Sequence, residues 1–439
     1  MHASARVLLY SETDKVTEFS EKLEHHGFQP LAAKSREEAL RIVAIRHPDI
    51  AIVDAGSGRD GVRFYDDLQE VRPDGGIPTI VIGHSEQPDD SERQAEFLPP
   101  PFRDVELFRR LEVLARLVTM QDELHRRSET SMLYGMTAPQ DVGPPQEVPD
   151  AQVLVVADDE GRRNEVGGLV APAAAVSTAA KTYEAMDRLL AGEFDAVVAV
   201  SVGDPEAILD FCRNLRNHVN LYNTPLLVLT DGGGEAGLHS TYNAGASDVL
   251  ELPVEAEQLL PRLRHLMKQQ RYRRAMQKTY REAQQDATAD ALTGLFSHGY
   301  LHAHLQKQIE NCKQWQKSLS LGFFDITDMA GLNARHGYVA GDRLLRQIGG
   351  MIGGLVRAED LAARLGGDKF CIVLPDAPMV AALPVLHRIA GVIDFTEFAV
   401  PGVDEPISIE LRTGCAEWQS DDTAETLIAR ACANSQGAD

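Results

Sequence analysis

Short apolar runs alternate with amphipathic stretches through the first part of the chain. RVLLY, DIAIVD and PTIVIG have the length and β-branched content of buried strands, and apolar residues at helical spacing, including Phe19 and Leu23, lie between them. Strands that alternate with helices in this way predict βαβ units and a parallel sheet. We therefore assign residues 1–125 to a first α/β domain.

The same pattern restarts near residue 151. Its apolar runs are AQVLVVADD, DAVVAV, TPLLVLTD and NAGASDVLELPV, so residues 151–268 resemble a diverged copy of the first domain, again with a doubly wound sheet. Residues 126–150 contain a stretch rich in Pro and Gly, and we interpret them as a linker.

A third block follows a long polar helix. Residues 269–289 contain no Gly or Pro and many Arg and Lys, which predicts a stalk helix. Its basic side chains are compatible with a nucleic-acid contact, but a solvated helix face is the interpretation that we prefer. Residues 290–439 combine helical patterns with the apolar runs SLGFFDI, FCIVLP and SIELRTGCAEW, which predicts an α+β domain.

Charge and composition narrow the classes of partner. The 439 residues include 66 acidic and 43 basic ones, and the resulting net charge of −23 repels the phosphates of nucleic acids. No apolar run approaches the roughly 18 residues of a membrane span, and the start of the chain does not have the pattern of a signal peptide. The five cysteines lack metal-binding spacing, so we expect reduced thiols, no Cys/His metal site and a cytoplasmic protein.

Both N-terminal blocks resemble response-regulator receiver domains, in which an Asp at the end of a central strand accepts a phosphoryl group. In the first block Asp54 ends the run DIAIVD, which implies that it is the phosphoacceptor; the alternative is an Asp that merely ends a strand. Asp60 and Gly61 follow at turn spacing, while Ser11 and Glu12, Gly83 and Pro100 stand where the family has its acidic pair, Thr and Lys. Without that Thr and Lys, phosphorylation would switch the domain poorly.

The second block departs from the receiver pattern at the acceptor itself. Asp158, Asp159 and Thr230 match family positions, but Val200 replaces the acceptor and Leu252 replaces the Lys. The resemblance then implies a domain that cannot accept phosphate, which serves as a dimerisation adaptor or, alternatively, as a spacer. We expect a homodimer and protein partners that bind through the receiver-like domains.

The third block resembles a GGDEF domain, the catalytic domain of diguanylate cyclases. The motifs DALTGLFSH, FFDITDMAGLNARHGYVAGD and RAEDLAARLGGDKF occur in the order of that family. With two receiver-like blocks in front, the resemblance extends to the PleD family of response regulators and covers the whole chain. It implies two flavodoxin-like domains followed by an α+β GGDEF domain.

Diguanylate cyclases join two GTP molecules, because each 3′-hydroxyl attacks the α-phosphate of the other while Mg²⁺ neutralises the triphosphates. The resemblance implies that Asp325 and Asp368 are the metal-binding positions. It also implies that Asn333 and Asp342 recognise guanine. Part of a GTP site is therefore present in the sequence.

Three departures from the cyclase pattern affect the metal and the triphosphate. Lys369 stands where the family has Glu, Ala330 stands where it has a phosphate-binding Lys, and the family's closing segment with further triphosphate contacts is absent. A positive charge at Lys369 disfavours Mg²⁺ between Asp325 and Asp368. We therefore expect no metal in this site and no enzymatic activity, so that these two Asp residues and Lys369 are remnants.

An RxxD motif precedes the signature loop at the spacing of the family's inhibitory product site. It consists of Arg357 and Asp360, and by the resemblance Arg388 on the next helix completes it. An Arg pairs with guanine O6 and N7, and a carboxylate accepts from guanine N1 and N2, so these residues suit cyclic di-GMP. The alternative is a surface ion pair between Arg357 and Asp360.

Our interpretation is a catalytically inactive GGDEF protein that works as a cyclic di-GMP receptor and signalling scaffold. The member that we judge nearest within the family implies an adaptor in the cell cycle or in regulated proteolysis, located in the cytoplasm at a cell pole. The alternative is a residual diguanylate cyclase that its product inhibits and receiver phosphorylation controls.

Overall fold

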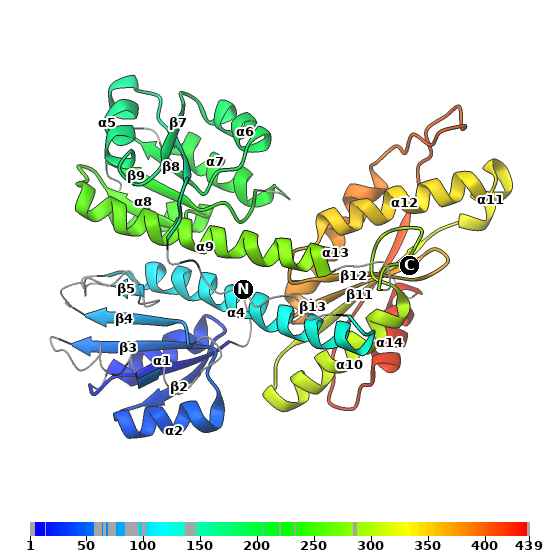
Figure 1. Ribbon diagram of the computed structural model, residues 1–439, viewed down its shortest axis with the longest axis horizontal. Helices are drawn as coiled ribbons and strands as arrows, with labels where there is room; N and C mark the ends of the chain where they lie inside the picture. Colours follow the sequence, from blue (N-terminus) through cyan, green and yellow to red (C-terminus); the bar gives the residue numbers. More distant parts are fainter. Residues whose placement is uncertain are drawn as a thin grey trace. The chain divides into compact units, whose positions relative to one another are not determined.

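The structure, a computed structural model, contains three β-sheets with flanking helices (Figure 1). It describes residues 5–13, 15–56, 64, 67–68, 76–83, 96–98, 102–136, 145, 147–203, 205–218, 221–231, 234–283 and 288–436. The expected fold class, two flavodoxin-like domains and an α+β domain, is confirmed.

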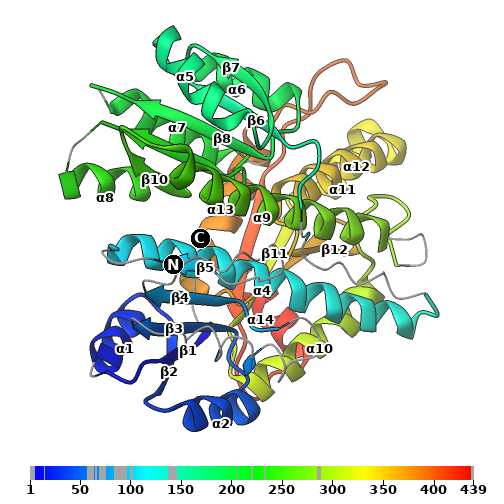
Figure 2. The same ribbon diagram turned by 60° about the vertical axis from the view of Figure 1, so that its left-hand side comes forward.

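The first sheet has the strand order β2-β1-β3-β4-β5, and these strands lie side by side in Figure 2. The β1–β2 and β4–β5 pairs are parallel, as the alternation of strands and helices predicts. Its described elements are β1 (Arg6–Tyr10), α1 (Lys15–His25), β2 (Gln29–Ala33), α2 (Arg36–Arg46), β3 (Ile50–Gly56), β4 (Thr79–Gly83) and β5 (Glu96–Leu98).

The second sheet is fully parallel, in the order β10-β9-β8-β6-β7. Because helices cover both faces, the three central strands β6, β8 and β9 are mostly apolar and supply alternate residues to two cores. Its elements are β6 (Gln152–Val156), α5 (Glu160–Val170), β7 (Ala175–Ala179), α6 (Thr182–Ala191), β8 (Ala196–Ser201), α7 (Glu206–Asn217), β9 (Leu226–Thr230), α8 (Gly234–Ala244) and β10 (Asp248–Glu251).

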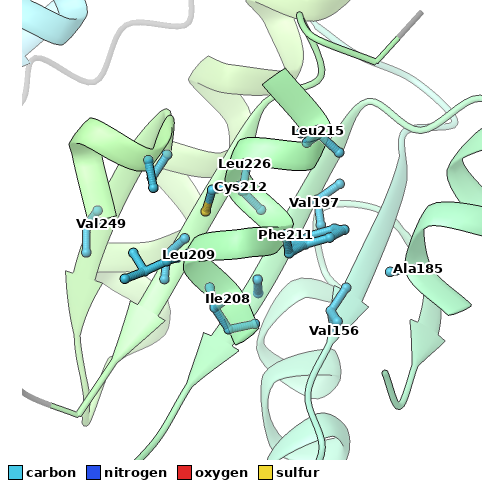
Figure 3. Packing of buried hydrophobic residues seen from close by; sticks show 14 of the residues in the cluster. Val156, Ala185, Val197, Ile208, Leu209, Phe211, Cys212, Leu215, Leu226 and Val249 are labelled. Atoms are coloured by element: carbon cyan, nitrogen blue, oxygen red, sulfur yellow. The ribbon is translucent and has the colours of Figure 1, made fainter. Parts of the chain in front are cut away.

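Helix α7 illustrates how sequence spacing builds one of these cores. Ile208, Phe211, Cys212 and Leu215 recur at helical spacing and therefore lie on one face of the helix. Figure 3 shows this face against the sheet, where Phe211 lies near Val197. Burial of that apolar face stabilises the domain.

The third sheet is antiparallel, in the order β12-β13-β11-β14. Strand β13 begins at the signature loop, and the end of its neighbour β11 lies beside that loop, so the sheet positions the candidate site. The elements of this domain are α10 (His298–Trp315), β11 (Leu319–Ile326), α11 (Met329–His336), α12 (Tyr338–Leu355), β12 (Leu361–Gly366), β13 (Lys369–Pro375), α13 (Met379–Asp394), β14 (Leu411–Glu417) and α14 (Ala424–Gln436).

Two long helices pass through positions where we expected domain boundaries. Helix α4 (Asp104–Leu133) continues beyond residue 125, and α9 (Ala256–Ala283) joins the last helix of the second domain to the expected stalk. No helix among the described residues is long and apolar enough to cross a membrane. The chain divides into two compact units, residues 1–51, 115–141 and 276–439 in one and residues 52–114 and 142–275 in the other.

Within the first of these units, a fully buried carboxylate on α4 joins that helix to α10. Glu123 Oε1 accepts hydrogen bonds from Arg127 Nε at 2.6 Å and from His304 Nε2 at 3.0 Å, and Gln308 donates to the other oxygen. Burial alone would raise the pKa of Glu123, but the charges of His304 and Arg127 hold it at about 2. This network joins the two helices together with further polar contacts, such as the ion pair between Lys307 and Glu129.

Glu123→Ala should lower the free energy of unfolding by about 3 kcal/mol or more, because it leaves the buried Arg127 guanidinium without its carboxylate. Chemical unfolding followed by the fluorescence of Trp315 and Trp418 measures this change, since both residues belong to the first unit.

The matched control is Glu129→Ala on the same helix, which removes a partly exposed ion pair with Lys307 and should cost less than about 1 kcal/mol. Because the pKa of Glu123 falls from about 4.5 in the unfolded chain to about 2 in the folded one, the ionised carboxylate stabilises the fold fully above pH 4.5. This stabilisation is lost as the pH falls toward 2. The difference between wild type and Glu123→Ala should therefore shrink in acid. Equal losses in the two variants would contradict the role of Glu123.

Candidate functional site

The signature loop is a tight turn between β12 and β13. Gly366 and Gly367 have φ of +135° and +58°, conformations that favour glycine over residues with a Cβ. Arg364 fixes this turn, because its Nε and Nη2 donate to the Gly367 carbonyl oxygen at 3.1 and 2.7 Å while Nη1 contacts Asp290 at 3.1 Å. The turn is thereby tied to the first residue of the opening motif.

The structure brings Asp325, Asp368 and Lys369 together at this turn. Asp325 lies directly opposite Lys369 in the β11–β13 ladder. The Lys369 Nζ atom is 3.2 Å from Asp325 Oδ1 and 3.0 Å from Asp368 Oδ1. Hydrogen bonds to Asp368 and Asp325 raise the pKa of Lys369, so its ammonium group stays charged.

This arrangement bears on the Mg²⁺ that cyclase chemistry uses. Asp325 and Asp368 supply hard carboxylate oxygens, the ligands that Mg²⁺ prefers, but the Lys369 ammonium group contacts both of them. No group of three His, Cys, Asp or Glu that could hold a metal ion occurs among the described residues. A metal ion that binds these two carboxylates therefore has to displace the Lys369 ammonium group.

The two residues expected to recognise guanine lie on neighbouring helices. Asn333 is on α11 and Asp342 is near the start of α12, with an exposed side chain. Asn333 Oδ1 is buried and has no hydrogen-bond partner among the described residues. A Cβ at position 341 would lie 2.0 Å from this oxygen, so Gly341 permits the close approach of the two helices.

The RxxD motif forms a compact turn before β12. The Arg357 backbone N–H donates to Asp360 Oδ2 at 2.9 Å, and the Asp360 N–H donates to the Arg357 carbonyl oxygen at 3.2 Å. Burial and the neighbouring Glu359 carboxylate raise the pKa of Asp360 to about 6. The carboxyl that is expected to bind a ligand is thus buried and held close to Arg357.

A cavity of about 340 Å³ lies at this turn, and its lining includes Arg357, Asp360, Glu359 and, from α4, Arg116. Arg388 is not among its lining residues; its Nη2 donates to the Leu355 carbonyl oxygen at 3.0 Å. The structure therefore brings two of the three expected residues together in one cavity.

Sequence reasoning missed Arg116 and Glu359. Arg116 Nε donates to Glu359 Oε1 at 2.9 Å although the two residues are 243 positions apart. Nothing in the spacing of α4 distinguishes Arg116 from the other charged residues of that helix. The only available signal was the place of Glu359 within the RxxD motif.

In the first receiver-like domain, Asp54 is half-buried on β3. Ser11 is buried just after β1, while Glu12 accepts a hydrogen bond from the Tyr10 hydroxyl at 2.8 Å. Gly83 ends β4. Asp60, Gly61 and Pro100 lie outside the described residues. The assignment of Asp54 as the phosphoacceptor stays a prediction.

In the second receiver-like domain, the expected acidic pair makes local contacts. Asp159 caps α5 by accepting from the Arg162 N–H at 2.8 Å, and Asp158 is 3.2 Å from Lys181 Nζ. Val200, at the acceptor position, is buried in β8. Thr230 ends β9, and Leu252 follows β10.

With this geometry established, comparison with known proteins identifies the third domain. Residues 287–438 match the family described as "Diguanylate cyclase, GGDEF domain". The third domain is a GGDEF domain.

The relatives extend the likeness beyond the GGDEF domain. The response regulator PleD of Caulobacter vibrioides is 25% identical over 441 residues, which cover 98% of this chain and 95% of PleD. Diguanylate cyclase DgcP of Pseudomonas aeruginosa is 29% identical over 150 residues, 34% of this chain and 22% of DgcP. A solved GGDEF domain of DgcB from Caulobacter crescentus, in complex with c-di-GMP, has a TM-score of 0.34 and 24% identity over 35% of this chain and 87% of that chain.

These findings correct one expectation from the sequence. We expected no enzymatic activity, and this was wrong, because the matched family and the relative DgcP are named as diguanylate cyclases. That expectation rested in part on the charge of Lys369, whose ammonium group pairs with Asp325 and Asp368 in the structure. The full-length likeness supports a PleD-like response regulator. The member of the family that we judged nearest from the sequence is PopA, and a particular likeness to PopA is not supported.

Lys369→Met should increase the affinity of this loop for Mg²⁺, because it frees the oxygens of Asp325 and Asp368 and leaves two carboxylates that repel each other. Titration of wild type and variant with Mn²⁺, followed by water-proton relaxation, measures the change without any turnover. The control is Lys313→Met on α10, which should bind as wild type does. An unchanged affinity in Lys369→Met would show that the ammonium group does not compete with the metal.

Proposed function

We propose that this chain is a signalling protein of the diguanylate cyclase class whose GGDEF domain binds cyclic di-GMP at the RxxD cavity. The observation that carries the proposal is the placement of Arg357 and Asp360 in one cavity of about 340 Å³. A volume of this size lies in the range of small-molecule sites. The proposal joins the sequence motif to a concave surface where a ligand has room.

The chemistry of the cavity suits a guanine base. An Arg guanidinium donates two parallel hydrogen bonds to guanine O6 and N7, and a carboxylate accepts from N1 and N2. Asp360 is buried, so its hydrogen bond to a ligand forms away from competing water. Arg388, whose guanidinium reaches the Leu355 carbonyl oxygen next to the motif, is proposed as the third residue.

The cyclase part of the proposal rests on the matched family and the named relatives. In this chemistry the 3′-hydroxyl of each GTP attacks the α-phosphate of the other, two pyrophosphates leave, and two GGDEF domains meet face to face. From the family resemblance we propose that Asn333 and Asp342, on the neighbouring helices α11 and α12, bind guanine. A homodimer would supply the second domain.

The receiver-like domains are proposed as the input and partner-binding part of the protein. Phosphorylation of Asp54 would control the GGDEF domain, and the second domain would serve as an adaptor. A scaffold role in the cell cycle or in regulated proteolysis, with a cytoplasmic and polar location, remains a prediction from family resemblance.

Arg357→Ala should weaken cyclic di-GMP binding about tenfold or more, since a bidentate guanine contact contributes roughly 1–3 kcal/mol. Isothermal titration calorimetry on the full chain measures the dissociation constant. The control Arg41→Ala removes an exposed guanidinium that pairs with Glu37 on α2 and should leave the affinity unchanged. Equal affinity in wild type and Arg357→Ala would overturn binding at the RxxD cavity.

With GTP and Mg²⁺, the purified protein should form cyclic di-GMP, and its rate should fall as product accumulates. Arg357→Ala should sustain its rate at product concentrations that slow the wild type, because the inhibitory contact is gone. Chromatographic separation of the nucleotides measures both rates. A wild type that forms no product would contradict the cyclase assignment and leave the binding proposal to calorimetry.

A further inference from the structure

The wall of the RxxD cavity formed by α4 carries a positive charge. Arg116 lines the cavity together with Arg357, and its side chain is mostly buried. Its guanidinium is not free, because Nε donates to Glu359 Oε1 at 2.9 Å. The cavity therefore contains a second guanidinium, which comes from outside the GGDEF domain and is neutralised by a residue within the RxxD motif.

We propose that Arg116 is a phosphate-binding residue of this cavity and that Glu359 occupies its guanidinium while the cavity is empty. The inference rests on the proposed binding of cyclic di-GMP and adds two residues to that site. It also adds a consequence: a ligand held by Arg357 and Arg116 contacts both the GGDEF domain and helix α4.

The charges of the cavity allow Arg116 to exchange the Glu359 carboxylate for a ligand phosphate. Among the described residues, the lining carries three cationic side chains and four carboxyl groups, which are Arg116, Lys317 and Arg357, and Asp49, Glu359, Asp360 and Asp376. Cyclic di-GMP brings two phosphate charges, and a guanidinium forms its strongest hydrogen bonds with phosphate or carboxylate oxygens. Arg116 can therefore pass from the Glu359 carboxylate to a ligand phosphate without losing a charged partner.

Glu359 is poorly satisfied as an acceptor. Its side chain is 5% exposed, and Oε2 has no hydrogen-bond partner among the described residues. A buried carboxylate oxygen without a donor is costly, so Glu359 is not optimised purely for stability. The Glu359 charge also contributes, after burial, to the raised pKa of Asp360. Glu359 thus opposes an anionic ligand in two ways, by pairing with Arg116 and by its own charge.

The test compares two variants that break the same ion pair from opposite sides. Arg116→Ala removes the phosphate ligand and should weaken cyclic di-GMP binding about tenfold, as expected for a charge-assisted hydrogen bond. Glu359→Gln frees Arg116 and removes a negative charge, and it should tighten binding about threefold. Calorimetry on the full chain with cyclic di-GMP measures both constants.

Two controls separate binding from folding. Arg109→Ala removes a guanidinium on the same helix that pairs with Glu112 and does not line the cavity, so its affinity should match wild type. Arg116→Lys keeps the charge but not the planar fork and should bind with intermediate affinity. Thermal unfolding of each variant establishes that it is folded at the temperature of the titration.

A merely structural Arg116–Glu359 pair predicts that both variants change affinity in the same direction, and that result would overturn the inference. Unchanged binding in Arg116→Ala, with loss of binding in Arg357→Ala, would also overturn it while the proposed function stands. If Arg357→Ala binds as tightly as wild type, the proposed function itself fails. Opposite shifts in Arg116→Ala and Glu359→Gln support the exchange of partners.

Discussion

The buried Glu123 carboxylate on α4 is the interaction on which the geometry of the RxxD cavity depends. The Glu123 carboxylate accepts a hydrogen bond from Arg127 Nε. Arg127 Nη2 in turn donates to the carbonyl oxygens of Glu359 and Asp360 at 3.2 and 2.9 Å. Through Arg127, this side chain of α4 therefore fixes the backbone of the motif whose residues line the cavity. Without the compensating charges of Arg127 and His304, burial of Glu123 would be strongly unfavourable.

A second charged cluster also joins α4 to the GGDEF domain. Lys317 Nζ lies 3.4 Å from Asp49, 3.1 Å from Asp122 and 3.8 Å from Asp376, which come from three separate segments of the chain. Burial would lower the pKa of Lys317, but these carboxylates raise it. The Thr119 hydroxyl also donates to Asp376 Oδ2 at 2.7 Å. In a chain with a net charge of −23, one lysine thus gathers acidic groups that would otherwise repel one another.

The residues of these networks link the RxxD cavity to helix α4, which begins in the first receiver-like domain. Arg116, Thr119, Glu123 and Arg127 lie on one stretch of α4 at helical spacing, so they face the GGDEF domain together. A ligand that changes the partner of Arg116 acts on the helix whose position the other three residues fix. Cyclic di-GMP binding and the placement of α4 would then be coupled through one short segment.

The sequence by itself determined the three sheets, the signature turn and the RxxD motif. Periodicity placed the strands, because alternate or continuous apolar positions report which faces are buried, and short motifs such as Arg357 with Asp360 act across a few residues. Tertiary structure alone decided that Lys369 lies between Asp325 and Asp368, that Arg388 does not line the cavity, and that Arg116 meets Glu359. The physical reason is that local spacing specifies a face of a helix or a strand, whereas the partner of a charged side chain depends on which distant segment packs against that face.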